Sequence, residues 1–337
     1  MILAAGLNDG WTYRDRVAPA EAGLMVSALY AARHRHSDRV TWRRRLAAGE
    51  IACNGRPLAA DGPVAAGDRL VWHRPPWWEE AVPAAWGVVH DDGDLLVIDK
   101  PAGLPVLPAG GFLEHTVLRL LERRHRHDSA GVPRPVHRLG RFTTGLLVCA
   151  RRPASRAWLS ALLRESTAAG AAGHGALAGA GGCEKVYRAL LEPGLLPLAP
   201  GASLRFEGAI GRRPHPRLGW IWCAASAVGA EAPADRSPDL SPDLPACSTL
   251  TLLERHPVAD LVAVAIASGR PHQIRIHCAA LGAPLLGDPL YGPGGLARPQ
   301  GLPGEGGYQL QAWRLRLRLP QPDGGCLRLE APVPLAP

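Results

Sequence analysis

The chain has 337 residues, of which 47% are hydrophobic and 20% charged, a mixture typical of a globular protein with one large core and a smaller domain. No apolar run approaches the ~18 residues of a membrane span, so we expect no membrane role. The first residues lack the basic and apolar regions of a secretory signal, which makes the cytoplasm the expected compartment. The net charge of +8 favours a polyanionic partner, because basic side chains release counterions when they bind a phosphate backbone.

Arginine supplies almost all of the positive charge. Of 38 basic residues only two, Lys100 and Lys185, are lysines, and a coding bias toward arginine is sufficient to explain the excess. A lysine that persists in such a chain is a candidate for a position that a planar guanidinium cannot fill. Seven scattered cysteines form no CxxC pair, and His272 and His277 have no third ligand nearby in the sequence, so we expect no metal site.

Residues 1–80 are rich in arginine and predict a small domain of helices and strands. The stretch "SDRVTWRRRLAAGE" is typical of a short basic helix capped by Ser37 or Asp38, and "IACNGRPL" of a hairpin that turns at Asn54 and Gly55. Charge runs of this kind are usually solvated helix faces, but here the charge and the helix-plus-hairpin pattern together favour RNA binding. The arginines expected to contact RNA are Arg39, Arg43, Arg44, Arg45 and Arg56.

Residues 81–87 are expected to form a linker, because the stretch "RPPWWEEAVPAAW", residues 74–86, is rich in proline and tryptophan. From 88 to 335, short alternating strands such as "KVYRALLE" and "LVAVAIA" accompany helical patterns, which predicts an α+β domain on a mainly antiparallel mixed sheet. The segments 166–183 and 226–247 carry few large apolar residues, so we expect them to be low-complexity insertions.

The stretch "SGRPHQIRIHCAALGAPLLGDPLYG", residues 268–292, combines a helix with a loop that is punctuated by glycines. Pro271 stands where the first turn of a helix tolerates proline, and His272, Arg275 and Ala279 then share one helix face. The stretch matches neither a phosphate-binding P-loop nor a dinucleotide-binding fingerprint. We therefore expect no nucleotide cofactor.

Four stretches in chain order resemble the successive motifs of the RluA-type pseudouridine synthases. They are "DDGDLLVIDKPAGLPV", "PVHRLGRFTTGLLVCA", "EKVYRALLE" and the stretch at 268–292. The smaller domain is similar to the αL-type RNA-binding domain, through a helix followed by the patterns "G-x-I-x-x-NGRP" and "V-x-x-GDRL". The resemblance implies the pseudouridine synthase fold over 88–335, an rRNA or tRNA partner, a monomer, and no cofactor.

The reaction implied by the resemblance detaches uracil from its ribose, rotates it and rejoins it through a ring carbon. Arg138 resembles the arginine that fills the gap left by the flipped base, and Tyr187 the tyrosine that stacks on uracil and assists its deprotonation. Arg275 resembles the basic residue that pairs with a catalytic carboxylate. That carboxylate belongs two residues after Arg138, where this chain has Gly140, and its absence is expected to leave Arg275 without its partner.

Three further basic residues within these motifs are expected to contact RNA: His137, Lys100 and Lys185. Because glycine offers neither a nucleophile nor a base, three hypotheses for the activity remain open. In the first, another carboxylate reaches the site and the enzyme is active. In the second, the chain is a catalytically inactive RNA-binding or RNA-remodelling protein, and in the third it is a protein-interaction module.

The candidates for a substitute carboxylate are Asp288, Asp99 and Asp94, although each also fits a structural role in a turn or at the end of a strand. The motif on both sides of Gly140 is otherwise intact, with "HRL" before it and "TTGLL" soon after it, and this favours the active enzyme. If the rest of the site is intact, the substitution Gly140→Asp is expected to create or raise activity.

Overall fold

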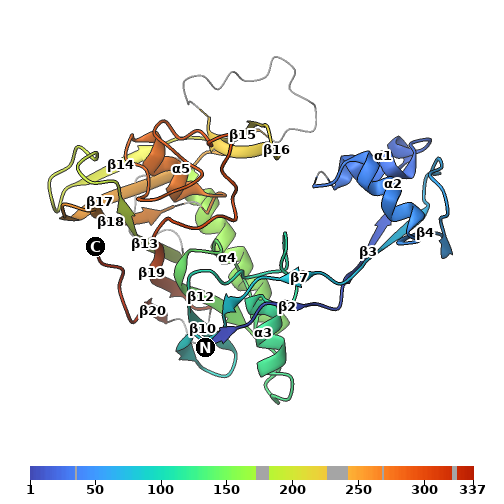
Figure 1. Cartoon of the computed structure of the whole chain (residues 1–337). Helices are drawn as coiled ribbons and strands as arrows, with labels where there is room; N and C mark the ends of the chain where they lie inside the picture. Colours follow the sequence, from blue (N-terminus) through green and yellow to red (C-terminus); the bar gives the residue numbers. More distant parts are fainter. Residues whose placement is uncertain (35, 172–181, 226–241, 268, 321–324) are drawn as a thin grey trace. The chain divides into compact units, whose positions relative to one another are not determined.

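Two compact units make up the described chain. The computed structural model describes residues 1–34, 36–171, 182–225, 242–267, 269–320 and 325–337. The smaller unit is Ala5–Glu80, and the larger unit combines Met1–Ala4 with Ala81–Pro337 (Figure 1).

The smaller unit begins at Ala5 and ends at Glu80, whereas the predicted smaller domain begins at residue 1 and ends at residue 80. Residues 1–4 belong to the larger unit, because β1 (Ile2–Leu3) pairs antiparallel with β8 (Val82–Pro83). Val82 and Ala84 are buried in the main hydrophobic cluster of the larger unit. The predicted linker at 81–87 is therefore not a separate segment, since its apolar side chains complete a core.

The smaller unit packs two helices and a four-stranded antiparallel sheet, in the order β3-β6-β4-β5, around an aromatic core. Trp42 and Trp72 are fully buried and their rings meet edge to face. Asp38 caps the predicted basic helix by accepting a hydrogen bond from the Thr41 amide at 2.8 Å. The elements are β2 (Gly6–Leu7), β3 (Trp11–Arg16), a 3₁₀ turn (Pro19–Glu21), α1 (Val26–Arg33), α2 (Arg39–Ala47), β4 (Ile51–Cys53), β5 (Arg56–Pro57), β6 (Arg69–Arg74) and β7 (Trp78–Glu79).

The larger unit is built on a ten-stranded sheet in the order β14-β17-β18-β13-β19-β12-β10-β9, with β11 on β12 and β20 on β19. Among the described strands of this sheet, only β12 and β19 pair parallel, which confirms the predicted α+β class with a mainly antiparallel mixed sheet. The elements are β9 (Gly87–Asp91), β10 (Leu95–Lys100), α3 (Val117–Arg124), β11 (Arg134–Pro135), β12 (Thr144–Ala150), α4 (Pro153–Ala171), β13 (Cys183–Leu191), β14 (Ser203–Glu207), β15 (Ile210–His215), β16 (Gly219–Ala224), β17 (Cys247–Arg255), β18 (Asp260–Ile266), α5 (Gln273–Ala280), β19 (Leu310–Arg318) and β20 (Cys326–Glu330).

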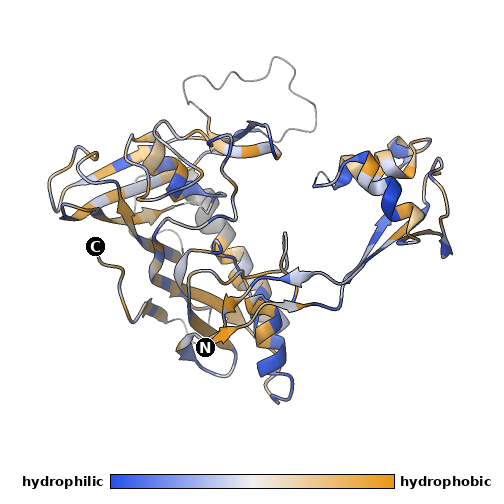
Figure 2. Ribbon diagram, in the orientation of Figure 1, coloured by the Kyte–Doolittle hydropathy of each residue, from blue (hydrophilic) through white to orange (hydrophobic). Residues whose placement is uncertain are grey.

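The central strands β10 and β12 are almost continuously apolar (Figure 2). Strands with this composition are buried on both faces of a sheet, whereas half-exposed strands alternate. Helix α3 places Val117, Leu120 and Leu121 in the same hydrophobic cluster. The strands that carry the candidate site are therefore anchored in the main core.

The two predicted insertions lie partly outside the described residues, which omit 172–181 and 226–241. The ends of both segments belong to regular structure: α4 continues to Ala171, Cys183 begins β13 and Cys247 begins β17. Leu244 also forms an isolated bridge with Ile210. The described ends of both segments are therefore continuous with the neighbouring helix and strands.

Candidate active site

The register of the sheet assigns the candidate side chains to faces. Lys100, Gly145, Ala312 and Tyr187 form one row across β10, β12, β19 and β13. Residues in one row point to the same face, and their neighbours along each strand point to the opposite face. Tyr187 and Arg188 therefore face different sides of the sheet.

Gly140 is exposed in the loop that leads into β12, and a tyrosine hydroxyl lies beside it. A Cβ atom at position 140 would lie 2.9 Å from Oη of Tyr308 and 3.1 Å from Oγ1 of Thr143. The first distance is shorter than real Cβ contacts, so a side chain at this position would have to displace the hydroxyl of Tyr308. The Tyr308 ring is buried, with only 5% of the residue exposed.

Close approaches of the backbone bring Tyr308 to this point. Gly307 has a φ of +127°, and a Cβ there would lie 2.5 Å from the carbonyl oxygen of Gly287. A Cβ at Gly306 would meet the ring of Phe142 at 2.6 Å. Only glycine fits both positions, so the Gly-Gly pair lets the chain run against the loops at 142 and 287 before Tyr308. Tyr308 is not among the site residues predicted from the sequence, and its local signal there is the Gly306-Gly307-Tyr308 stretch.

Arg275, on α5, forms a buried ion pair with Asp288. Nε donates to Oδ2 at 2.7 Å and Nη2 to Oδ1 at 2.6 Å, and the side chains are 4% and 1% exposed. Burial opposes the charge of Arg275, but its hydrogen bonds and attraction to Asp288 raise its pKa above the usual value. The prediction that Gly140 leaves Arg275 without a partner is therefore wrong.

The ion pair borders the space beside Gly140 through two tyrosine rings. The guanidinium carbon of Arg275 lies 4.1 Å from the ring centre of Tyr308 and 5.1 Å from that of Tyr291. At these distances a cation is attracted to the negative face of an aromatic ring. Arg275 thus connects Asp288 to Tyr308.

Two of the candidate carboxylates, Asp288 and Asp94, have structural partners. Oδ1 of Asp288 also accepts from the amides of Leu290 and Tyr291, at 2.8 and 3.0 Å, so the carboxylate holds its own turn as well as Arg275. Asp94 accepts from the amide of Arg152 at 2.9 Å and from the hydroxyl of Ser155, at the beginning of α4. Because Asp94 precedes β10 at the end that pairs with Ala150, it lies at the far end of β12 from Gly140.

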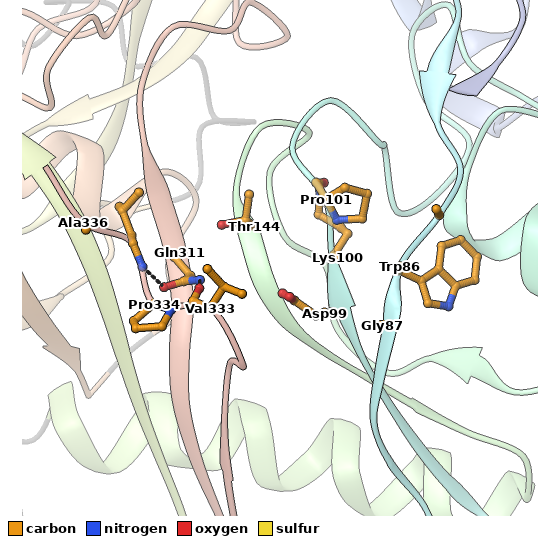
Figure 3. A pocket seen from close by; sticks show the side chains of 12 residues that line it. Trp86, Gly87, Asp99, Lys100, Pro101, Thr144, Gln311, Val333, Pro334 and Ala336 are labelled. Atoms are coloured by element: carbon orange, nitrogen blue, oxygen red, sulfur yellow. Dashed lines mark hydrogen bonds between the residues drawn. The ribbon is translucent and has the colours of Figure 1, made fainter. Parts of the chain in front are cut away.

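The third candidate carboxylate, Asp99, lies on the other face of the sheet. It neighbours Lys100 on β10 and therefore points away from the face that carries Tyr187. There it lines a pocket with Thr144 and Gln311, next to the carboxyl-terminal residues 333–336 (Figure 3). Burial raises the pKa of Asp99. The structure thus places none of the three carboxylates at Gly140.

Tyr187 shares a hydrophobic cluster with Tyr308 and Phe142. Burial raises the pKa of Tyr187 to about 12, so the phenol is neutral at physiological pH. Arg138 is exposed, and its charge acts on His272 at the beginning of α5. Three of the predicted site residues, Tyr187, Arg138 and Arg275, therefore belong to the surroundings of one loop, and Gly140 is part of that loop.

His272 is held neutral in an unusual backbone conformation. Its φ of 53° is left-handed, which is rare for a side chain other than glycine and is often found at functional sites. Burial and the charge of Arg275 lower its pKa to about 4. Because the hydroxyl of Tyr291 donates to the carbonyl of Trp222, Nδ1–H of His272 donates to Tyr291 at 2.8 Å, which leaves Nε2 as an acceptor.

The three motif residues expected to contact RNA have partners within the protein. Lys100 is fully buried, and its ammonium donates to the carbonyls of Pro101, Leu104 and Arg141 at 2.8–2.9 Å, while burial lowers its pKa to about 7. Because these three carbonyls engage its ammonium group, Lys100 has a structural role in place of the predicted contact with RNA. The amide of Val148 donates to Nε2 of His137, and Lys185 is half-buried near the carbonyl of Leu163.

The arginines of the smaller unit divide into two groups. Arg39, Arg44 and Arg56 are exposed, and so is Arg43, which lies 3.3 Å from Asp61. Arg45 instead packs on the rings of Trp42 and Trp72, 4.3 and 4.6 Å from their centres. The predicted RNA contact of Arg45 therefore does not fit its position, which is part of the aromatic core.

The residues that the structure describes include neither a candidate membrane span nor a candidate metal site. No helix among them is long and apolar enough to cross a membrane. Nor do these residues bring together three or more His, Cys, Asp or Glu side chains in an arrangement that could hold a metal ion.

Comparisons with known proteins agree with the four motifs. The family model described as RNA pseudouridylate synthase matches residues 94–280. An uncharacterized RNA pseudouridine synthase of Synechocystis is 39% identical over 91% of this chain and 93% of its own length. RNA pseudouridine synthase 5 of Arabidopsis thaliana is 32% identical over 97% of this chain and 94% of its own length.

A solved structure shares the fold. Human RNA pseudouridylate synthase domain containing 1 superposes with a TM-score of 0.51 at 22% identity, over 75% of this chain and 86% of that one. The fold and the relatives together define an RNA-modifying isomerase of the pseudouridine synthase class. The chain belongs to the RNA pseudouridylate synthase family, as the RluA-type motifs predicted.

Proposed function

We propose that the protein isomerises uridine to pseudouridine in a structured RNA, either rRNA or tRNA, and that it acts as a monomer. The observation that carries this proposal is a set of contacts beside the loop of Arg138 and Gly140: Tyr187 shares a hydrophobic cluster with Tyr308, and Arg275 packs on the Tyr308 ring. A neutral, partly buried tyrosine ring can stack on a flipped uracil, and an exposed arginine can occupy the gap that the base leaves.

The smaller unit supplies a second, electrostatic contact with the RNA. Arg39, Arg44 and Arg56 are exposed around a basic helix and an adjoining hairpin, and Arg43 lies beside them. Phosphate contacts of this type position an RNA without reading its sequence. We therefore assign affinity to the smaller unit and chemistry to the larger unit.

The proposal is tested with RNA from cells that lack the gene. Purified protein is incubated with this RNA, and pseudouridine is mapped at single-nucleotide resolution before and after. New pseudouridine at one or a few uridines is the expected result. If the RNA binds and no uridine is converted, the protein is an RNA-binding member of the family without catalytic activity.

A further inference from the structure

The missing carboxylate at position 140 raises the question of which group acts on the nucleotide instead. We propose that Tyr308 is the general acid and base of this site, an inference that rests on the proposed isomerase function. Its hydroxyl lies 2.9 Å from the place of a Cβ at Gly140, where the side chain of any larger residue would begin.

The surroundings of Tyr308 fit this role. The ring is buried and meets Phe142 edge to face, with the ring centres 6.5 Å apart. No described residue forms a hydrogen bond with the hydroxyl, which borders the exposed Gly140. A fixed ring with an available hydroxyl is the arrangement that general acid catalysis requires.

Arg275 supplies the charge that a tyrosine needs when it gives up a proton. Its guanidinium carbon lies 4.1 Å from the Tyr308 ring centre, and Asp288 fixes it there through two hydrogen bonds. A buried positive charge at this distance stabilises a phenolate. The arginine thus acts on Tyr308 in a site where residue 140 offers no carboxylate.

The Tyr308 hydroxyl alone is sufficient for both proton transfers of the isomerisation. As the bond between ribose C1′ and uracil N1 breaks, its electron pair goes to the uracil and the Tyr308 hydroxyl gives its proton to N1. This leaves a phenolate beside the ribosyl oxocarbenium ion. After the base rotates, the C5=C6 electron pair forms the C5–C1′ bond, and the phenolate takes the proton from C5. Tyr308 ends as a neutral phenol, and no other reactant is consumed.

Other hydroxyl groups near the site are less suited to the transfer. The hydroxyl of Tyr291 already donates to the carbonyl of Trp222 at 2.8 Å. Thr143 Oγ1 lies 3.1 Å from the place of the same Cβ, but an aliphatic alcohol is a far weaker acid than a phenol, whose pKa is near 10. Thr143 therefore offers a matched control at the same position.

The test compares Tyr308→Phe with Thr143→Val, since each substitution deletes one hydroxyl and preserves the shape of the side chain. RNA labelled with tritium at uracil C5 is prepared from cells that lack the gene, and tritium release is followed under single-turnover conditions. Tyr308→Phe is expected to lower the rate by about 10²–10⁴-fold. Its affinity for the same RNA and its unfolding midpoint in urea are expected to match those of the unaltered protein, and Thr143→Val is expected to keep its rate.

Three results would overturn the inference. A Tyr308→Phe rate close to that of the unaltered protein would show that the hydroxyl takes no part in the chemistry. An equal loss in Thr143→Val would show that the loss reflects disturbed packing beside Gly140. If the unaltered protein binds the RNA and releases no tritium, the proposed function itself fails and the inference with it.

Discussion

The hydroxyl of Tyr308 occupies the space into which a side chain at position 140 would extend, 2.9 Å from the place of its Cβ. Gly140 is therefore one half of a packing arrangement whose other half comes from the loop before β19. Because the Tyr308 ring is buried against Phe142 and Arg275, the hydroxyl cannot move aside without disturbing both contacts.

Gly140→Asp is expected to lower activity, which reverses the expectation from sequence alone. The new Cβ would collide with Tyr308, and overpacking of this kind typically destabilises a protein by ~1–3 kcal/mol. Adding Tyr308→Phe removes the colliding oxygen, so the double variant is expected to regain the lost stability and to place a carboxylate in the vacated space. Urea unfolding and tritium release from labelled RNA measure the two effects. A single Gly140→Asp variant that is as stable as the unaltered protein, and more active, would contradict this packing argument.

Asp288→Asn is expected to lower the free energy of unfolding by ~3–5 kcal/mol, because it leaves the charge of Arg275 buried without its counter-charge. Glu207→Gln provides the control, since Glu207 pairs with Arg205 in an exposed ion pair and such pairs contribute little to stability. Urea unfolding of the two variants measures the difference. Equal, small losses would mean that Asp288 does not stabilise the site through Arg275.

Acid is expected to destabilise the larger unit through its buried histidines. Burial lowers the pKa of both His272 and His277 to about 4, below the ordinary value of about 6.5. Between these values the unfolded chain binds more protons than the folded chain, so the free energy of unfolding falls as the pH is lowered from 6.5 to 4. His277 donates from Nε2 to the carbonyl of Gly208 and accepts at Nδ1 from the hydroxyl of Ser248, an arrangement that suits the neutral ring.

Urea midpoints measured between pH 7.5 and 4.5 test this dependence. His277→Gln removes one of the titrating groups, so its midpoint is expected to fall less steeply with acid than that of the unaltered protein. Parallel slopes for the two proteins would show that His277 does not stay neutral in the folded state.

Local features of the fold could be predicted from the sequence because neighbouring residues determine them. The cap at Asp38 and the turn at Asn54 and Gly55, which have φ values of 49° and 80°, follow from short-range hydrogen bonding and backbone preference. The apolar runs of β10 and β12 likewise predicted buried strands.

The arrangement of the site depends on contacts between distant segments. Asp99 fits a candidate carboxylate in sequence, but the register of β10 places it on the opposite face, and a shift of one residue would reverse that assignment. The partner of Arg275 was also unpredictable, because the loop of Asp288 folds back onto α5. Tyr308 reaches Gly140 through the close approach of the backbones at Gly307 and Gly287. Hydrophobic periodicity in the sequence does not predict such an approach.

Substitutions at Arg44 and Arg45, which are neighbours in the sequence, are expected to affect different properties, RNA binding and stability. Arg44 is exposed, so Arg44→Gln is expected to weaken RNA binding and to reduce the slope of log K against log salt by roughly 0.7–0.9, the value for one phosphate contact. Arg45 packs on Trp42 and Trp72, so Arg45→Gln is expected to lower stability by ~0.5–2 kcal/mol and to leave the salt slope unchanged. Filter binding at several salt concentrations and urea unfolding separate the two effects. If Arg45→Gln changes the salt slope as much as Arg44→Gln does, the side chain of Arg45 leaves the tryptophan rings to contact phosphate.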